Sequence, residues 1–302
     1  MGRLSAARGA RSDRGSAVSQ LGLFVLVSAL AGTLVAALAL PVLGSTGLGA
    51  RAGAEGFQSL PADLATPPLP QSSTIVDARG GVLARFYYEN RIDVPLAKVA
   101  PVMRQAIVGI EDSRFYDHGG IDLRGTVRAL VNNASGDSVQ GGSTLTQQYV
   151  KLVLLEQATA KGNEDAAQEA VARSGVQGYA RKLRELRYAI ALEEKLTKPQ
   201  ILERYLNIAY FGSGAYGVEA ASRHYFSIPA AKLSLPQAAM LAGIVNSPGA
   251  YDPTLHPQAA KDRRNVVLAR MAELSYITPA EADKAAAAPL GLKVTKAPNG
   301  CA

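Results

Sequence analysis

The feature that most constrains this chain is a long apolar run near its N-terminus. No charged residue occurs between Gly15 and Ala50, and the stretch from Leu21 to Val42 is almost wholly apolar. A helix needs about 20 such residues to cross a bilayer core of about 30 Å. Four arginines precede the run and the next is Arg51, which places the N-terminus in the cytoplasm and the rest on the far side. The sequence therefore predicts a basic cytoplasmic tail at residues 1–20 and a transmembrane helix at residues 21–42.

A cleaved signal peptide is the alternative explanation for this run. The apolar region of a signal peptide spans about 7–15 residues before a cleavage site with small residues. The run here is longer, although its alanine-rich composition would permit cleavage. Its length favours an uncleaved anchor, and hence a single-pass protein of the cell membrane.

The residues after the anchor divide into a spacer and a helical body. Residues 43–73 are rich in Gly, Ala, Ser and Pro, which predicts an extracytoplasmic linker without a core of its own. Two β-like runs, residues 73–77 and 82–88, flank Arg79-Gly80-Gly81 and predict a small hairpin. From about residue 95 onward the apolar residues recur with helical spacing, so the body is predicted to be mainly α.

Three helix starts carry the pattern of a capping box. Thr197, Ser234 and Thr278 each stand three residues before Gln or Glu, with a proline in between. In such a box the two side chains satisfy backbone donors of the first turn, where a proline costs little. The buried stripes expected for two helices are Leu183, Leu186 and Ile190, and Ile201, Leu202, Tyr205 and Ile208.

Composition limits the chemistry. The net charge is +7, with +3 in the first 20 residues. This modest excess suits an anionic substrate or an anionic membrane surface as well as nucleic acid. Three histidines and the single Cys301 predict neither a metal cluster nor an intrachain disulfide.

Two acids stand where helix stability disfavours them. Residues 102–110 have helical apolar spacing, and Glu111 and Asp112 follow at once. Negative charge at a helix C-terminus opposes the macrodipole. Either the pair is merely solvated, or the fold requires a carboxylate at this point. Phe115 and His118, which follow, are by themselves more typical of a core residue and a structural hydrogen-bonding residue.

Two later segments are rich in polar side chains. Residues 139–152 (VQGGSTLTQQYVKL) join glycines to hydrogen-bonding groups and Lys151, which suits a phosphate or carboxylate ligand and equally suits a polar loop that caps a helix. Arg181, Lys182 and Glu185 have the i, i+3 and i, i+4 spacing that places them on one helix face. That pattern is also typical of a surface ion-pair ladder, which contributes little stability.

The order of these segments resembles the peptidoglycan glycosyltransferase family, which forms the N-terminal domain of class A penicillin-binding proteins and the monofunctional transglycosylases. The likeness covers about residues 74–290. Leu152 departs from it where many relatives have Asn, and residues 156–178 form a long insert that is expected to be mobile and to shape the acceptor side. The motifs that carry the likeness are Glu111-Asp112-x-x-Phe115-x-x-His118-x-Gly120, Gly142-Ser143-Thr144-x-Thr146-Gln147-Gln148-x-x-Lys151, Arg181-Lys182-x-x-Glu185 and Ile201-Leu202-Glu203-x-Tyr205-Leu206-Asn207.

The resemblance implies a lysozyme-like, two-lobed helical fold and the polymerisation of lipid II, a disaccharide-pentapeptide on undecaprenyl pyrophosphate. In that reaction a base deprotonates the acceptor sugar 4-hydroxyl, which displaces pyrophosphate from the donor C1 with inversion. The motif match assigns the base to Glu111 and a second catalytic carboxylate to Glu185. The positions that match substrate-binding residues are Asp112, Phe115, His118, Ser143, Thr144, Gln147, Gln148, Lys151, Arg181 and Lys182.

The resemblance also implies partners. They are lipid II, the growing glycan strand, the membrane and other proteins of cell-wall synthesis, without nucleic acid. No residue is assigned as a metal ligand and no cofactor is required, although Mg²⁺ or Mn²⁺ could share the charge of the leaving group, as in several relatives.

Two other classes of function stay open at this point. One is a membrane-anchored lysozyme-like hydrolase, which would have no use for pyrophosphate-matching cations. The other is a non-catalytic scaffold, against which the intact Glu111 and Glu185 argue. The Ser-x-x-Lys and Lys-Thr-Gly boxes of a penicillin-binding transpeptidase do not occur, so residues 291–302 are read as a tail. The hairpin region nonetheless resembles the bifunctional class, which leaves open a shortened class A protein or a stand-alone enzyme.

Overall fold

The computed structural model describes residues 28, 55–120, 122, 143–171 and 175–301. The chain divides into two units, residues 1–60 and residues 61–302. In the first unit, residues 55–58 are helical. The predicted basic tail and, apart from residue 28, the predicted transmembrane helix lie outside the described residues. Within the described part of the chain, no helix is both long and apolar enough to span a membrane.

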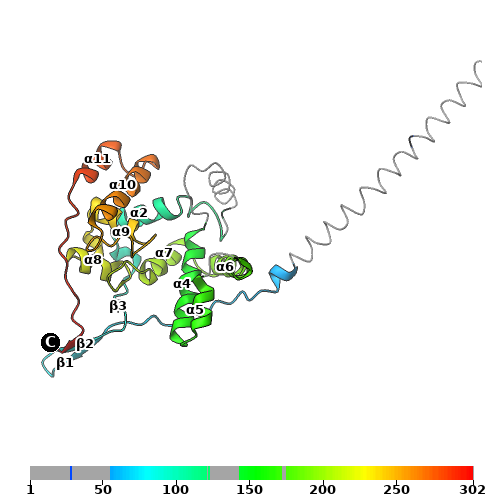
Figure 1. Ribbon diagram of the computed structural model, residues 1–302, viewed down its shortest axis with the longest axis horizontal. Helices are drawn as coiled ribbons and strands as arrows, with labels where there is room; N and C mark the ends of the chain where they lie inside the picture. Colours follow the sequence, from blue (N-terminus) through cyan, green and yellow to red (C-terminus); the bar gives the residue numbers. More distant parts are fainter. Residues whose placement is uncertain (1–27, 29–54, 121, 123–142, 172–174, 302) are drawn as a thin grey trace, which may run out of the picture. The chain divides into compact units, whose positions relative to one another are not determined.

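The second unit is mainly helical, as predicted (Figure 1). The α-helices are α2 (Pro101–Glu111), α4 (Leu145–Ala160), α5 (Glu164–Val171), α6 (Gly175–Lys195), α7 (Lys198–Ile208), α8 (Val218–Phe226), α9 (Leu235–Ile244), α10 (Pro257–Glu273) and α11 (Pro279–Ala287). The 3₁₀ helices are η1 (Leu96–Lys98) and η2 (Ala230–Lys232), and the strands are β1 (Ser73–Val76), β2 (Val82–Phe86), β3 (Asn90–Arg91), β4 (Ala215–Tyr216) and β5 (Gly300–Cys301).

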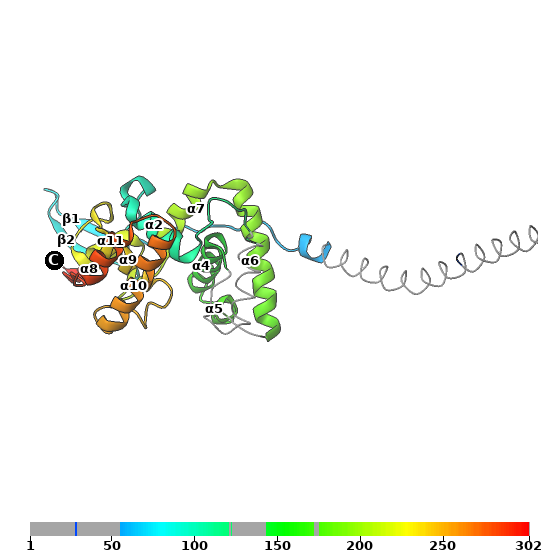
Figure 2. The ribbon, with the colours of Figure 1, turned by 90° about the horizontal axis from the view of Figure 1, so that it is seen from above.

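The helices form two groups that lie side by side in Figure 2. The apolar group consists of α2, α8, α9, α10 and α11, with α9 packed between α2 and α10. Residues 238–244 of α9 are all buried, as expected of a helix that is hydrophobic all round. The polar group consists of α4, α5 and α6. Helix α7 packs on α4 and also contacts α8, so it joins the two groups.

Three predictions about the helices can be compared with the structure. The capping boxes at Thr197, Ser234 and Thr278 are all present. The buried stripe of α7 is also confirmed, since all four predicted side chains are buried. The stripe expected for α6 is wrong, because Leu183 is 49% exposed while Glu185, Ala189 and Leu192 are buried. The inward face of α6 carries a carboxylate, which the apolar pattern could not indicate.

The predicted hairpin is confirmed as β1 and β2. In its turn Asp77 Oδ1 accepts hydrogen bonds from the N–H groups of Arg79 and Gly81, and Gly80 has a φ of 84°, which favours glycine. A third strand, β5, pairs antiparallel with β2. The predicted C-terminal tail is therefore packed onto the fold, and the N–H groups of Lys293 and Thr295 donate to carbonyls of α8.

The predicted linker also packs against the domain from residue 61 onward. Leu64 and Leu69 are partly buried against the hydrophobic core. Asp63 forms an ion pair with Lys195 at the end of α6, and the Gln157 side chain of α4 donates to the Ala65 carbonyl. Two residues of the predicted linker therefore pack on the core of the body.

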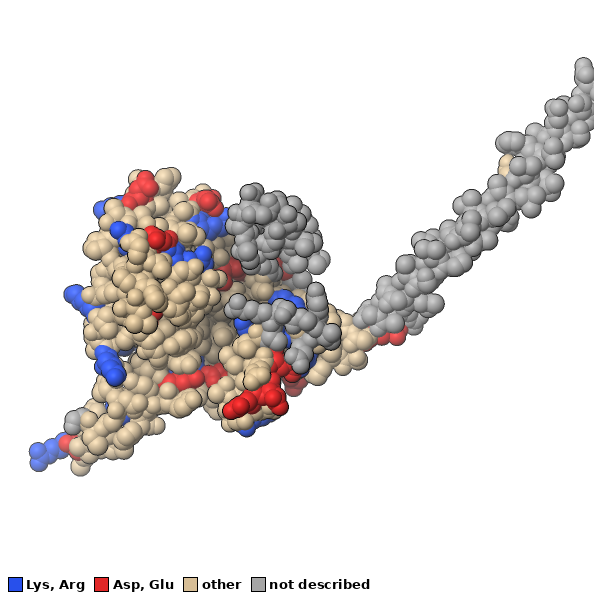
Figure 3. Space-filling view, viewed as in Figure 1, with Lys and Arg blue, Asp and Glu red and all other residues tan. Residues whose placement is uncertain are grey.

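Most of the described part of the insert at residues 156–178 is helical. Helix α4 continues to Ala160, Lys161 and Gly162 form a turn, and α5 packs against α4. The mobility expected for the insert stays a prediction. Figure 3 shows acidic side chains gathered over α5, whose first turn carries Glu164 and Asp165. Negative charge in a first turn stabilises a helix through its macrodipole.

A buried ion cluster fixes the start of this insert to β3. The guanidinium of Arg91 is fully buried, pairs with Glu89 and Glu156, and lies 5.2 Å from the ring centre of Tyr216. Burial and the adjacent charge of Glu89 raise the pKa of Glu156 to about 7, against the lowering effect of Arg91. Arg91 also donates to the Asn207 carbonyl, so the cluster ties β3 and α4 to α7.

Candidate active site

Glu111 is the last residue of α2, where the sequence placed it. Its Oε2 accepts a hydrogen bond from Gln148 Nε2 over 2.9 Å. Its Oε1 is buried and has no hydrogen-bond partner among the described residues. Burial raises the pKa of Glu111, and the charge of Asp112 adds to the rise, while Gln148 and the guanidinium of Arg263 oppose it. A buried carboxylate with one oxygen free is suited to accept a proton.

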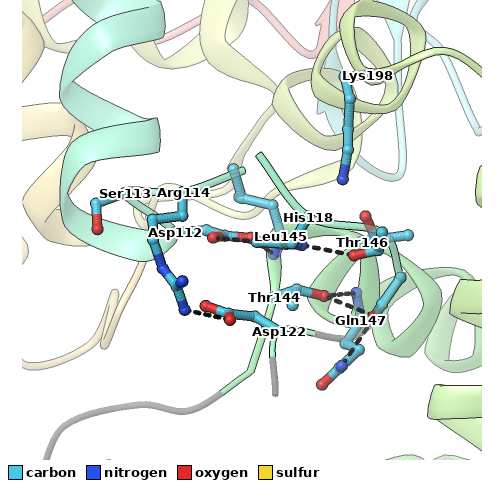
Figure 4. Close-up of polar contacts among 12 residues, drawn as sticks. Asp112, Ser113, Arg114, His118, Asp122, Thr144, Leu145, Thr146, Gln147 and Lys198 are labelled. Atoms are coloured by element: carbon cyan, nitrogen blue, oxygen red, sulfur yellow. Dashed lines mark hydrogen bonds and ion pairs between the residues drawn. The ribbon is translucent and has the colours of Figure 1, made fainter. Parts of the chain in front are cut away.

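Asp112 has a different environment from its neighbour. Its Oδ1 is 2.8 Å from His118 Nε2, and its Oδ2 accepts from the Leu145 N–H over 3.0 Å (Figure 4). Leu145 begins α4, so the Asp112 charge lies at a helix N-terminus, where it is stabilising. Burial opposes the protonation of His118, but hydrogen bonds to Asp112 and to the Gly119 carbonyl outweigh it and raise the pKa of His118. Asp112 thus ties the end of α2 to the start of α4.

Gly120 allows the segment after His118 to lie against α6. A Cβ at this position would come within 2.7 Å of the Ala189 carbonyl carbon, closer than real Cβ atoms approach. The Gly120 carbonyl accepts from Thr144 Oγ1 over 3.3 Å and from Gln147 Nε2 over 3.1 Å. Thr144 also caps α4 by accepting from the Gln147 N–H. The glycine and threonine of these motifs therefore join the segment before α4 to both α4 and α6.

The two consecutive glutamines of α4 serve two different clusters. Gln148 reaches Glu111, whereas Gln147 Oε1 accepts from Lys182 Nζ over 2.8 Å. Successive residues of an α-helix point about 100° apart, so one helix can supply both sides. Lys182 Nζ also donates to Ser143 Oγ over 2.7 Å. Helix α4 therefore stands between a carboxylate site and a cationic site.

The cationic site is built on α6. Arg181 donates to Glu185 Oε1, and Lys182 Nζ lies 3.5 Å from Glu185 Oε2, so the predicted i, i+4 and i, i+3 pairs are present. Glu185 is only 2% exposed, which distinguishes this arrangement from a surface ladder. Burial lowers the pKa of Lys182, and the charge of Glu185 opposes that effect. A cavity of about 180 Å³ between α4, α5 and α6 is lined by Arg181 and Arg184.

Two of the residues predicted to bind substrate are placed less directly. Phe115 is fully buried, and Lys198 Nζ lies 4.6 Å from its ring centre. Its ring therefore supports the fold at this point, and substrate contact by Phe115 stays a prediction. Lys151 is half-buried on α4, and its charge acts on Lys182.

Two residues near Glu111 were not predicted as functional. Tyr205 donates through Oη to Gln148 Oε1 over 3.1 Å, and Arg263 places its charge close enough to act on Glu111. The sequence placed Tyr205 in a buried stripe and in the fourth motif of the family likeness, but it assigned no role to the side chain. A further signal was that a buried tyrosine hydroxyl usually requires a hydrogen-bond partner.

One group of side chains has the composition of a metal site. The ligand atoms of Asp112, His118 and Asp122 lie within 4.8 Å of one another. Each is already engaged, however, because Asp112 binds His118 and the Leu145 N–H while Asp122 binds Arg114 (Figure 4). These contacts make the group a structural clamp between the end of α2 and the start of α4.

Comparison with known proteins identifies the family. A family model described as Transglycosylase matches residues 79–272. The chain belongs to this family. It is 38% identical over 229 residues to penicillin-binding protein 1F of Bacillus subtilis (76% of this chain and 30% of that protein), and 40% identical over 226 residues to penicillin-binding protein 1A of Aquifex aeolicus (74% and 28%). The chain is thus an enzyme of the transglycosylase family.

One further relative and one solved structure are also similar to the chain. Penicillin-binding protein 1A of Mycobacterium tuberculosis is 38% identical over 211 residues, which are 69% of this chain and 24% of that protein. The crystal structure of penicillin-binding protein 1A from Haemophilus influenzae aligns with a TM-score of 0.42 at 23% identity, over 77% of this chain and 22% of that one. The chain spans less than a third of the length of these curated relatives.

Proposed function

We propose that this chain is a peptidoglycan glycosyltransferase of cell-wall synthesis that polymerises lipid II with inversion and releases undecaprenyl pyrophosphate. The observation that carries the proposal is that the two sides of α4 contact different charged groups. One side of this helix holds the partly satisfied carboxylate of Glu111, and the other holds the cations of α6. Transfer of a sugar from a pyrophosphate needs both a base and fixed positive charge.

Glu111 is the proposed base. Its carboxylate accepts the proton of the acceptor 4-hydroxyl, and Gln148 holds it through Oε2. Burial raises the pKa of this carboxylate, which makes it a stronger base once it is ionised. Asp112 is a weaker candidate because both of its oxygens are already hydrogen-bonded.

Lys151, Arg181 and Lys182 are the proposed binding groups for the donor pyrophosphate. Negative charge grows on the diphosphate as the bond to C1 breaks, so cations fixed in advance stabilise the transition state more than the ground state. Glu185 holds Arg181 and Lys182 from within the fold, and Gln147 and Ser143 orient the Lys182 ammonium. Of the other predicted residues, Thr144 caps α4 and binds the Gly120 carbonyl, and His118 binds Asp112, which accepts from the first N–H of α4.

The same proposal includes the location of the domain at the cell membrane. We infer a lysozyme-like glycosyltransferase domain at residues 74–290, held at the outer face of the cell membrane by a helix at residues 21–42. Its substrate carries a polyprenyl chain and stays in the bilayer, so an anchored enzyme meets it by two-dimensional diffusion. A partition test checks this topology. The chain should sediment with membranes, and protease added to spheroplasts should digest the part after residue 50.

The test of function is a polymerisation assay with the purified chain in detergent. Lipid II should be converted to glycan strands and undecaprenyl pyrophosphate. Incubation with preformed glycan strands separates the main rival, because a lysozyme-like hydrolase would shorten them. A chain that does neither would support the scaffold alternative.

A further inference from the structure

A buried tyrosine and a partly buried glutamine lie behind the carboxylate of Glu111. Tyr205 Oη, on α7, donates to Gln148 Oε1 over 3.1 Å, and Gln148 Nε2, on α4, donates to Glu111 Oε2 over 2.9 Å. Tyr205 is 0% exposed, so it cannot reach a substrate from this position. The three residues come from three helices that belong to different parts of the fold.

We propose that Tyr205 is a positioning residue that acts through Gln148: its hydroxyl fixes the amide so that N–H, and not the carbonyl oxygen, faces Glu111. The inference rests on the proposed function, since it gives Tyr205 a part in placing the proposed base. It adds to that function a residue that touches neither the sugar nor the pyrophosphate.

The argument starts from the two-sided chemistry of an amide. A glutamine side chain has a donor nitrogen and an acceptor oxygen, and a half-turn exchanges them. A carboxylate accepts hydrogen bonds only, so it requires the nitrogen side. By itself Glu111 could hold that orientation when ionised, but it would release the amide whenever it is protonated. A hydroxyl that donates to Oε1 from the other side holds the same orientation in both states.

Tyr205 is suited to this role because it stays a donor. Burial, and the charge of Glu111, raise the pKa of Tyr205 well above its usual value. Its hydroxyl therefore keeps its proton throughout the pH range in which the enzyme works. The direction of the chain is then fixed from tyrosine to glutamine to glutamate, and Glu111 Oε1 is left without a hydrogen-bond partner among the described residues.

Among the described residues, two other charged groups act on Glu111 and do not replace this contact. Arg263 contributes positive charge from α10, and Asp112 contributes negative charge from the next residue. Helix α9, which packs against α2, has no ionisable side chain. The hydrogen bond from Gln148 is the largest of the effects that lower the pKa of Glu111, against the larger effect of burial.

The test is Tyr205→Phe in the full chain, assayed with lipid II. The ring stays in its buried site, and only the donor to Gln148 is removed. We expect kcat at neutral pH to fall on the order of 10-fold, which is part of the 10²- to 10⁴-fold that a general base contributes. The KM for lipid II should not change. Because Gln148 can now turn its oxygen to a protonated Glu111, the acid limb of the pH–rate profile should move to higher pH.

Tyr225→Phe is the matched control. Tyr225 is also 0% exposed, and its hydroxyl donates to the Phe211 carbonyl over 2.9 Å, in the apolar group of helices. This variant also loses the donor of a buried tyrosine hydroxyl, which contacts Asp252 as well, so its melting temperature should fall at least as much. Its pH–rate profile should match that of the parent. An equal shift of the acid limb in both variants would show a general loss of structure and would overturn the inference.

A double-mutant cycle tests the route through Gln148. Gln148→Met should shift the acid limb by itself, and Tyr205→Phe in the same chain should add nothing further, because the two residues act in series. Additive effects would contradict the proposal. If Tyr205→Phe does not fold, Gln148→Met alone tests the proposal. An unchanged acid limb of its pH–rate profile would mean that the Gln148 amide does not orient Glu111.

A readout that does not need turnover separates this inference from the proposed function. With ¹³C-labelled glutamate, the Glu111 carboxyl signal can be assigned by its loss in Glu111→Gln and titrated in each variant. A higher pKa in Tyr205→Phe would support the inference even if the parent makes no glycan. A parent that polymerises lipid II, with unchanged rate and titration in Tyr205→Phe, would leave the function standing and remove Tyr205 from it.

Discussion

The two groups of helices bury different chemistry on their inward faces. In the apolar group, α9 places seven consecutive buried residues, 238–244, between α2 and α10. In the polar group, α6 turns Glu185 inward and holds it with Arg181 and Lys182. Desolvating a charge is costly unless it is paired, so a face of this kind contributes less stability than an apolar one. The comparison indicates that one group mainly supports the fold, while the other carries much of the candidate site.

Glu111 lies where these groups meet. It ends α2 of the apolar group, and its partner Gln148 belongs to α4 of the polar group. A carboxylate at a helix C-terminus is disfavoured by the helix macrodipole. At Glu111 the fold nevertheless places one there, at a point where the carboxylate is both buried and partly unpaired. Substitutions on the two sides should therefore separate effects on rate from effects on stability.

The largest effect is expected for Glu111→Gln. The amide keeps the shape and can still accept from Gln148, but it cannot take a proton, so kcat should fall by about 10²- to 10⁴-fold. Lipid II should still bind, because the cations of α6 are unchanged. Single-turnover polymerisation and a binding assay check the two statements, and near-parental polymerisation would show that Glu111 is not the base.

For the same variant, the direction in which the unfolding free energy changes with pH can also be predicted. Burial raises the pKa of Glu111, so the native state holds its proton more tightly than the unfolded chain. The unfolding free energy should then decrease as pH rises from the unfolded pKa to the folded one, and stay level above it. Glu111→Gln removes this dependence, and its melting temperature at neutral pH should equal or exceed that of the parent. A marked loss of stability at neutral pH would contradict the sign.

A smaller loss is expected for Glu185→Gln, in the polar group. Arg181 and Lys182 lose their anion, so the donor pyrophosphate is held less well in both ground and transition states. We expect kcat/KM to fall on the order of 10²-fold, together with a lower melting temperature. Glu193→Gln is the matched control on the same helix, since Glu193 pairs with Lys198 and lies about three turns along α6 from Lys182. It should change stability but keep kcat/KM close to the parent value.

The difference between the groups also decides what could be predicted from sequence. The capping boxes of α7, α9 and α11 are local, and each was confirmed together with the hairpin at β1 and β2. Strand β5 was missed because two residues carry no local signal, and its partner Ala84 lies far away in the sequence. Helix α5 was read as mobile because its alanine-rich sequence offers few apolar anchors.

In the site, the sequence predicted residue types better than their partners. The ion pairs of Glu185 follow from helical spacing and were found as expected. The separate directions of Gln147 and Gln148, and the link from Tyr205 to Glu111, depend on how α2, α4, α6 and α7 meet. No local sequence pattern shows how these helices pack together. For the same reason, the sequence predicted that Leu183 is buried, whereas in the structure Glu185 is buried and Leu183 is exposed.

The contact between the site and α6 can be tested with two adjacent glycines. Gly120→Ala would place a methyl group 2.7 Å from the Ala189 carbonyl carbon and the Ile190 nitrogen, so the loop or α6 must move. We expect a loss of about 1–3 kcal/mol in unfolding free energy, together with lower activity. Gly119→Ala is the control, because its methyl group would meet nothing within 4 Å. Equal effects at the two positions would show that the loop does not pack against α6 as described.

The smallest effect is expected on the outer face of α6. Leu183 is 49% exposed, so Leu183→Gln should change the unfolding free energy by no more than about 0.5 kcal/mol, since little apolar surface returns to water. Leu192→Gln on the same helix should cost several times more, because Leu192 is 6% exposed and belongs to the hydrophobic core. Urea unfolding of the two variants measures the contrast. A loss above about 1.5 kcal/mol for Leu183→Gln would mean that this face is packed. The buried face of α6 would then be the apolar stripe predicted from the sequence, which contains Leu183 and not Glu185.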